Sequence, residues 1–360
     1  MNRETEKKEP FWPARKSGFL LGANPLGWLS AIGMCALFLA ADPAWAQDST
    51  SDDGAENQRC LIVVRGVAGT DKYESIFSDA TSQWEEAADL AGFKTALITS
   101  PEGDDSCLAQ LEMKISEWRN VAELWIVLIG HGTFDGESAK FNLVGDDVAA
   151  TQIAEWLAER QQKTILINCA SSSGPFVNAL AGSNRVVVTA TKSGYETSFA
   201  HFGRFLAQML SEKNIDLDKD GRTSLLESVI AANGKTKEFY EADSRLPTEH
   251  ALIDDNGDAL GTPVEWYRGI RISREAKEQA QADGLRANQV FLKPPGPTDQ
   301  LSDEQQKERD KIESELELLI NRKSEFSEER YYQQMEAIML RLAKLYRTKP
   351  VNETEAEKGQ

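Results

Sequence analysis

The sequence predicts an α/β fold, with a mainly parallel β-sheet flanked by helices and a C-terminal α-helical hairpin. Short apolar runs rich in β-branched residues recur without alternation, which is typical of strands buried on both faces. Segments with apolar residues at helical spacing separate these runs, and strands that alternate with helices imply a parallel sheet. Near the C-terminus, apolar positions spaced by four and three residues predict the hairpin.

The predicted elements of the sheet follow one another from residue 60. Strands are expected at Leu61–Arg65, Lys94–Thr99, Glu123–Gly130, Thr164–Asn168 and Arg185–Thr191. Helices are expected at Lys72–Ala91, 105–119, Ala149–Arg160, Phe199–Leu210 and Leu225–Tyr240. The chain of 360 residues has room for one sizeable domain of this kind and an appendage.

Changes in composition divide the rest of the chain. The expected parts are a signal peptide at 1–46, a disordered linker at 47–59, the sheet domain at 60–270, a linker at 271–301, the hairpin at 302–348 and a disordered tail at 349–360. Ser302 and Gln305 fit a capping box that opens the first helix of the hairpin. We expect the hairpin to pack on its own domain, on a second copy of the chain or on a helical partner.

The first 46 residues have the composition of a secretory signal. Arg15 and Lys16 precede an apolar stretch from about Leu26 to Ala41, and Ala44-Trp-Ala46 fits a cleavage site. The apolar stretch is shorter than the roughly 20 residues that a membrane span needs. We therefore expect an exported protein, periplasmic or secreted, with no integral membrane segment after signal cleavage. An N-terminal membrane anchor is the alternative.

The charge of the chain excludes some partners. Asp and Glu number 58 against 40 Lys and Arg, and the formal net charge is −18. An acidic surface argues against binding of nucleic acid and of anionic membranes. It is compatible with bound divalent cations.

Three cysteines follow the signal segment, namely Cys60, Cys107 and Cys169. Export permits disulfides, and an odd number of cysteines leaves at least one thiol free. A disulfide between Cys60 and Cys107 is therefore possible, and Cys169 would then be the free thiol. Three reduced cysteines are the alternative.

A histidine and a cysteine stand directly after two successive predicted strands. Trp125-Ile-Val-Leu-Ile-Gly-His131-Gly ends one strand, and Thr164-Ile-Leu-Ile-Asn-Cys169-Ala-Ser-Ser-Ser-Gly ends the next. Because reactive groups collect at the carboxyl ends of neighbouring parallel strands, we expect His131 and Cys169 to meet there. An adjacent imidazole is the usual means of stabilising a nucleophilic thiolate. The Gly132 N–H group could stabilise an oxyanion.

These motifs resemble a known family. Gly-His-Gly followed by Cys-Ala-Ser-Ser-Ser-Gly looks like the legumain-like cysteine peptidases of the caspase–haemoglobinase clan, which includes the glycosylphosphatidylinositol transamidase catalytic subunit. The resemblance covers roughly Cys60 to Gly261. Within it, Val187–Ser198 is similar to the family's strand and loop that line the primary specificity pocket.

The resemblance implies a caspase–haemoglobinase-like fold and a Cys–His dyad that acts on a peptide or protein substrate without a cofactor. Cys169 would be the nucleophile and His131 the general acid, and the N–H groups of Gly132 and Cys169 would hold the oxyanion. The resemblance also implies a set of pocket residues, namely Thr189, Thr191, Ser193 and Glu196.

The chain departs from the legumain pattern around the nucleophile. Legumains carry an acidic residue two positions before the cysteine and another just after it, where this chain has Ile167 and Ala170. A preference for Asn or Asp therefore does not carry over. An acidic Glu196 in the pocket would instead favour a basic residue before the scissile bond.

A second motif predicts a calcium site. Residues 216–227 fit the EF-hand loop position for position, and the loop's candidate ligands are Asp216, Asp218, Asp220, Arg222, Ser224 and Glu227. Arg222 would bind through its carbonyl group and Glu227 through both carboxylate oxygens. Calcium there would be structural, since its chemistry adds little to thiol attack. A second acidic turn, Asp254–Asp258, is expected to be either a helper metal site or a surface turn.

The sequence thus predicts an exported, calcium-binding cysteine endopeptidase that works through an acyl-enzyme. A transpeptidase or transamidase with the same dyad is the alternative within enzymes. A calcium-stabilised, non-catalytic interaction module on a peptidase fold is the alternative from another class.

Overall fold

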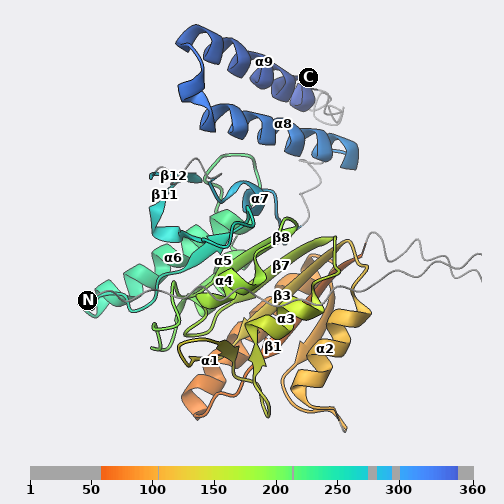
Figure 1. Cartoon of the computed structure of the whole chain (residues 1–360), viewed down its shortest axis with the longest axis vertical. Coiled ribbons are helices and arrows are strands. Elements are labelled where there is room, and N and C mark those ends of the chain that lie inside the picture. The colour runs from red at the N-terminus through yellow and green to blue at the C-terminus, as the bar shows by residue number, and fades with distance from the viewer. Residues whose placement is uncertain (1–57, 104, 213–214, 275–281, 294–300, 348–360) are drawn as a thin grey trace, which may run out of the picture. The chain divides into compact units, whose positions relative to one another are not determined.

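Seven β-strands form the central sheet in the computed structural model of the protein (Figure 1). The structure describes residues 58–103, 105–212, 215–274, 282–293 and 301–347. By its internal contacts the chain divides at Ser51 into two units, and the described residues all lie in the second unit. The predicted signal peptide and C-terminal tail lie outside the described residues, as do large parts of the predicted linkers.

Five strands of the sheet are parallel, which confirms the predicted fold class. They are β1 (Arg59–Arg65), β2 (Lys94–Ile98), β3 (Glu123–Ile129), β7 (Lys163–Asn168) and β8 (Arg185–Thr189). The antiparallel strands β9 (Leu252–Asp254) and β10 (Thr262–Pro263) extend the sheet beyond β8. The order is β10-β9-β8-β7-β3-β1-β2, so β3 and β7 are neighbours near its centre.

Helices cover both faces of this sheet, as the alternating sequence pattern predicts (Figure 1). Residues of α1 (Asp71–Leu90), α5 (Phe202–Ser211) and α6 (Leu225–Ala242) bury their apolar sides in one core cluster. Residues of α2 (Cys107–Glu117), α3 (Ala150–Trp156) and α4 (Pro175–Leu180) belong to the core cluster on the other face. Side chains alternate along each strand, so one strand contributes to both cores.

Short strands that the sequence pattern does not predict follow β3. The segments β4 (Gly132–Phe134), β5 (Ala139–Phe141) and β6 (Val148–Ala149) form a separate antiparallel sheet directly after the predicted histidine. Further along the chain lie η2 (Val264–Trp266), β11 (Tyr267–Arg268), β12 (Arg271–Ile272) and α7 (Leu285–Asn288). Both β12 and α7 fall within the segment 271–301 that the sequence predicts to be a linker.

The predicted C-terminal hairpin consists of α8 (Asp303–Asn321), η4 (Lys323–Glu325) and α9 (Glu328–Arg347) (Figure 1). Ser302 and Gln305 form the predicted capping box, in which each side chain bonds the other residue's backbone N–H. The hairpin also touches the preceding segment. The side chain of Gln289 donates to the carbonyl of Asp310 at 3.1 Å.

The possible disulfide between Cys60 and Cys107 is not formed in this structure. Both residues are free cysteines with no exposed surface, packed in the core cluster that α2 helps to cover. Burial raises the pKa of Cys60 to about 11 and also raises the pKa of Cys107. Both are therefore neutral thiols that act as small apolar core residues.

Among the described residues, no helix is both long enough and apolar enough to cross a membrane.

Candidate active site

The topology brings the ends of β3 and β7 together at one edge of the sheet. The two strands pair in parallel, with Leu128 opposite Asn168. The residues that follow each strand therefore leave the sheet side by side. Cys169 lies in the core cluster on the α1 and α5 face. The ring of His131 contacts Phe77 and Phe199, which belong to the same cluster or pack against it. The predicted pair therefore faces one side of the sheet.

His131 is a half-buried imidazole held among aromatic rings. The ring centres of Tyr73 and Phe77 lie 4.8 and 5.2 Å from its own. Its Nε2 atom lies 3.3 Å from the carbonyl oxygen of Ala68. A carbonyl can only accept, so Nε2 carries the proton in the neutral ring and Nδ1 keeps the lone pair. Burial lowers the pKa of His131, which favours this neutral form, although the Ala68 carbonyl acts against it.

Cys169 is covered by protein, with 5% of its surface exposed. A cavity of about 10 Å³ adjoins it, and its lining includes Phe77 and Phe199. Gly203, in the first turn of α5, lies directly against the thiol, because a Cβ atom there would be 2.8 Å from Cys169 Sγ. Burial, and secondarily the charge of Glu249, raise the pKa of Cys169 to about 12. The thiol is therefore neutral at pH 7 in this conformation.

The structure places His131 and Cys169 in one aromatic cluster without joining them. Both residues lie in the described range 105–212, and there no hydrogen bond links the Cys169 thiol to the His131 imidazole. They share Phe77 and Phe199, which contact the His131 ring and line the cavity beside Cys169. The catalytic role of the pair stays a prediction.

The two N–H groups predicted to hold an oxyanion have partners within the protein. Gly132 N donates to Ser171 Oγ at 3.3 Å, and that hydroxyl donates back to the Gly132 carbonyl at 3.2 Å. Cys169 N donates to the Leu128 carbonyl at 2.9 Å. Neither N–H group is available to a substrate in this conformation. Gly132 cannot carry a side chain, because a Cβ atom would lie 2.3 Å from the Ser171 carbonyl oxygen.

Three residues of the predicted substrate pocket are used to fasten a loop. Thr189 and Thr191 have no exposed surface, and Thr189 Oγ1 donates to the Thr191 carbonyl at 2.9 Å. Thr191 Oγ1 accepts from Gly174 N at 3.0 Å, which ties the end of β8 to the turn after Cys169. Ser193 Oγ accepts from Tyr195 N within the same loop. Their direct contact with a substrate stays a prediction.

The carboxylate of Glu196, the fourth predicted pocket residue, already has partners. It lies 2.6 Å from His250 Nδ1 and 3.7 Å from Lys192 Nζ, and it also accepts the backbone N–H groups of both residues. Two potentially cationic groups thus occupy the position that a basic substrate side chain would need. This arrangement does not favour the expected preference for basic residues.

Glu249 is the residue near the thiol that the sequence pattern does not reveal. Its carboxylate is 4% exposed and accepts N–H groups of His201 and Phe202, at 2.8 and 2.9 Å, where α5 begins. The Tyr240 hydroxyl also donates to it at 2.9 Å. Burial raises the pKa of Glu249, and these hydrogen bonds act against that rise. No local signal predicts this contact, because Glu249 follows α5 by almost forty residues of chain.

His201 is a packed side chain, as its apolar surroundings in the sequence suggest. Its ring contacts Phe199, Phe239 and Tyr240, and its buried Nδ1 atom has no hydrogen-bond partner. Burial and three nearby cationic side chains lower its pKa to about 4. A neutral imidazole fixed in this way is a poor candidate for acid–base catalysis at neutral pH.

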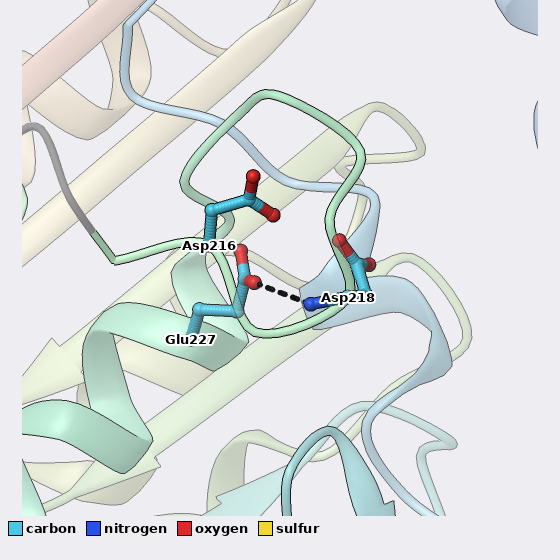
Figure 2. Close-up of side chains that lie close together, drawn as sticks. All are labelled: Asp216, Asp218 and Glu227. Carbon is cyan, nitrogen blue, oxygen red and sulfur yellow. Dashed lines mark hydrogen bonds between the residues drawn. The ribbon is translucent and has the colours of Figure 1, made fainter.

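The predicted calcium loop gathers three of its carboxylates. One oxygen from each of Asp216, Asp218 and Glu227 lies within 4.8 Å of the others, an arrangement that could hold a metal ion. Figure 2 shows these side chains together inside the loop, with the Asp218 N–H donating to Glu227. Glu227 has no exposed surface, and burial followed by the charge of Asp218 raises its pKa.

The other predicted ligands make contacts within the loop. Asp220 pairs with the guanidinium of Arg222 at 3.0 Å, and that guanidinium lies 3.7 Å from the centre of the Phe291 ring. Ser224 caps α6 together with Glu227. Gly221 has a φ of +86°, which fits the sharp turn that the motif requires of glycine. Gly221 thus makes the turn that the motif needs, while the Asp220 carboxylate is paired with Arg222.

The second acidic turn buries Asp254 and Asp255, while Asp258 at its end is exposed. Asp254 and Asp255 have 0% and 1% of their surface exposed. The Asp254 carboxylate accepts the N–H groups of Gly257 and Ala259, and Asp255 N donates to Asp283. Backbone donors thus satisfy these carboxylates without a metal ion.

Comparison with known proteins finds similarity among solved structures. No protein-family model and no curated protein matches the chain. Among solved structures, the chain is similar to the crystal structure of the Drosophila initiator caspase Dronc, with 16% sequence identity and a TM-score of 0.35. The similarity covers 58% of this chain and 83% of the caspase chain. None of these comparisons supports the legumain-like resemblance specifically, so function has to be argued from the residues.

Proposed function

We propose that this protein is an exported, legumain-like cysteine endopeptidase in which Cys169 and His131 form the catalytic dyad. One observation carries the proposal, namely that His131 and Cys169 follow the adjacent parallel strands β3 and β7 and face one side of the sheet. The carboxyl edge of a parallel sheet is where active sites of α/β proteins collect.

The residues can be given consistent roles. A proton passes from the Cys169 thiol to His131 Nδ1, which is left as an acceptor because Nε2 bonds the Ala68 carbonyl. The thiolate attacks the peptide carbonyl, and His131 then protonates the leaving amine. Water hydrolyses the resulting thioester and regenerates the thiol. The N–H groups of Gly132 and Cys169 would have to leave Ser171 and Leu128 to hold the oxyanion.

Two rival functions remain distinguishable by experiment. A transpeptidase would release the acyl-enzyme to an amine instead of to water, so an added amine would appear in the product. A non-catalytic interaction module would carry the same fold without any Cys169-dependent reaction. Retention of both His131 and Cys169 disfavours the module, since a scaffold needs neither residue.

The test uses mature protein and a panel of peptidyl acyloxymethyl ketones that vary the residue before the reactive group. We expect covalent labelling at Cys169, detected by peptide mapping, which Cys169→Ala abolishes and His131→Ala reduces by about 100-fold or more. Glu238→Gln is the control, because Glu238 is exposed on α6, pairs with Lys235 and should leave labelling within about twofold of the native rate. Labelling that survives His131→Ala unchanged would exclude the dyad. Absence of labelling by every ketone, in a variant whose Cys169 reacts with iodoacetamide, would exclude the enzyme.

We also propose that the loop 216–227 binds structural calcium through Asp216, Asp218 and Glu227. The carbonyl of Arg222 and the water-mediated position at Ser224 would complete the set, with Asp220 exchanging Arg222 for the ion. The specific observation that supports this is the convergence of motif positions one, three and twelve within the folded loop. Bound calcium would stabilise the folded protein by mass action.

Thermal unfolding with calcium and with chelator tests the calcium proposal. We expect calcium to raise Tm by several degrees, since a millimolar excess over a micromolar Kd stabilises by about 4 kcal/mol. Glu227→Gln should abolish this calcium-dependent difference, whereas Glu238→Gln, an exposed residue of the same helix, should keep it. The difference is the readout because Glu227 also caps α6. Equal Tm values under both conditions in the native protein would refute the site.

A further inference from the structure

We propose that residues Phe199–Arg204 form a cover over Cys169, that Glu249 holds this cover closed, and that substrate reaches the thiol only when the cover moves. The segment contains the first turn of α5 and the three residues before it. The inference concerns regulation of the active site and rests on the proposed function, because a cover has a purpose only over a reactive thiol. We call the segment the thiol cover.

The thiol cover lies directly against Cys169. A Cβ atom on Gly203 would lie 2.4 Å from Cys169 Cβ and 2.8 Å from its Sγ. The first turn of α5 therefore leaves no room for a side chain at Gly203 beside the thiol. Phe199, Ala200 and Arg204 also line the adjoining cavity of about 10 Å³, roughly the least volume that holds one water. A peptide carbonyl cannot come within reacting distance of Sγ here.

Glu249 attaches the thiol cover to the rest of the fold. This carboxylate accepts the N–H groups of His201 and Phe202, the residues that begin α5. Three residues after Glu249 the chain enters β9, which pairs with β8 of the main sheet. The Tyr240 hydroxyl also holds the Glu249 carboxylate by a hydrogen bond. Charge-assisted hydrogen bonds to a buried carboxylate are stronger than neutral ones. Glu249 thus connects the movable segment to fixed elements of the fold.

The thiol cover reaches both residues of the proposed dyad, His131 and Cys169. The Phe199 ring lies 5.9 Å from the His131 ring centre and 4.7 Å from that of Tyr73, and Phe199 also lines the cavity beside Cys169. Displacement of the cover would therefore expose the thiol and free one side of the imidazole together. The covered state accounts for two inactive features at once, the inaccessible thiol and the unjoined dyad.

Alkylation of the full mature protein by iodoacetamide, followed by peptide mapping, measures the cover directly. In the native protein we expect Cys169 to react slowly, together with Cys60 and Cys107, which have no exposed surface and report global unfolding. Glu249→Gln should accelerate alkylation of Cys169 by about tenfold or more, as loss of charge-assisted hydrogen bonds allows. Cys60 and Cys107 should keep their slow rates. Glu238→Gln on α6 is the charge-matched control and should change nothing.

Two further readouts separate a positioning role of Glu249 from simple destabilisation. Removal of its charge should shift the pH at half-maximal alkylation of Cys169 downward, because Glu249 opposes ionisation of that thiol. Phe199→Ala removes an aromatic ring from the cover and leaves Glu249 in place. It should also accelerate alkylation of Cys169 selectively. Parallel acceleration at Cys60 and Cys107 would mean unfolding and would overturn the proposal. Fast alkylation of Cys169 in the native protein would also overturn it. So would a Glu249→Gln variant in which Cys169 is alkylated no faster than in the native protein.

Alkylation needs no catalytic histidine, so its outcome is independent of the proposed activity. If Glu249→Gln exposes Cys169 selectively while peptidyl ketones still fail to label it, the cover stands and the peptidase proposal fails. If the ketones label the native protein rapidly, the peptidase stands and the cover fails.

Discussion

Asp255 and Asp283 are two carboxylates buried against each other, with 1% and 7% of their surface exposed. Burial raises the pKa of both, and the charge of Asp283 adds to the rise at Asp255, whose pKa reaches about 7. An aspartate in an unfolded chain has a pKa of about 3.9. Between these values the folded pair keeps protons that the unfolded chain releases, so the free energy of unfolding falls as pH rises through this window.

Asp283→Asn should remove much of this pH dependence. An asparagine carbonyl can still accept the N–H groups of Asp255 and Asn256, and its amide can donate to Thr262 Oγ1. We expect the variant to be more stable than the native protein by about 1–2 kcal/mol at pH 8 and less so at pH 5. Urea unfolding at both values measures this. Asp79→Asn, at an exposed position of α1, is the control, and an equal pH slope in all three proteins would contradict the account.

At the candidate active site, single residues could be predicted where the strand pattern places them. His131 and Cys169 follow apolar runs, so the ends of β3 and β7 locate them at one edge of the sheet. Their chemical state depends on contacts that no local pattern carries. Gly203 lies against the thiol and Glu249 bonds the turn that contains it, and both come from later parts of the chain. The sequence therefore predicts the positions of His131 and Cys169 but not the burial of the thiol.

At the scale of elements, long periodic segments could be predicted and short ones could not. The five parallel strands and the helices α1, α2 and α5 lie within a few residues of their expected positions. Strands of two or three residues, such as those between Gly132 and Ala149, are too short for alternation to show. A signal for α4 was present, because Pro175 after Gly174 favours a helix start. Antiparallel β9 and β10 depend on pairing with β8, which periodicity cannot reveal.

At the scale of the whole molecule, the hairpin is connected to the sheet domain through the segment around Phe291. The Arg309 side chain of α8 is 4% exposed, lies 5.8 Å from the Phe291 ring centre and faces Glu313 at 3.7 Å. Arg222 of the predicted calcium loop lies against the same ring at 3.7 Å. Burial raises the pKa of Glu313 to about 7, and the charge of Asp220 contributes to the rise. Of the expected modes, these contacts favour packing of the hairpin on its own domain.

Arg309→Ala should therefore loosen the hairpin, because it leaves the half-buried Glu313 carboxylate without its cation and removes the contact with Phe291. We expect a loss of about 2 kcal/mol in the free energy of unfolding, and faster amide hydrogen exchange at residues 289–292 and 309–313. Arg341→Ala is the matched control. Arg341 joins α8 to α9 through Glu308 and Glu315, but all three side chains are exposed, so the variant should unfold at the same urea concentration as the native protein. If both variants exchange at the same rate in residues 289–292, the hairpin does not depend on Arg309 for its attachment.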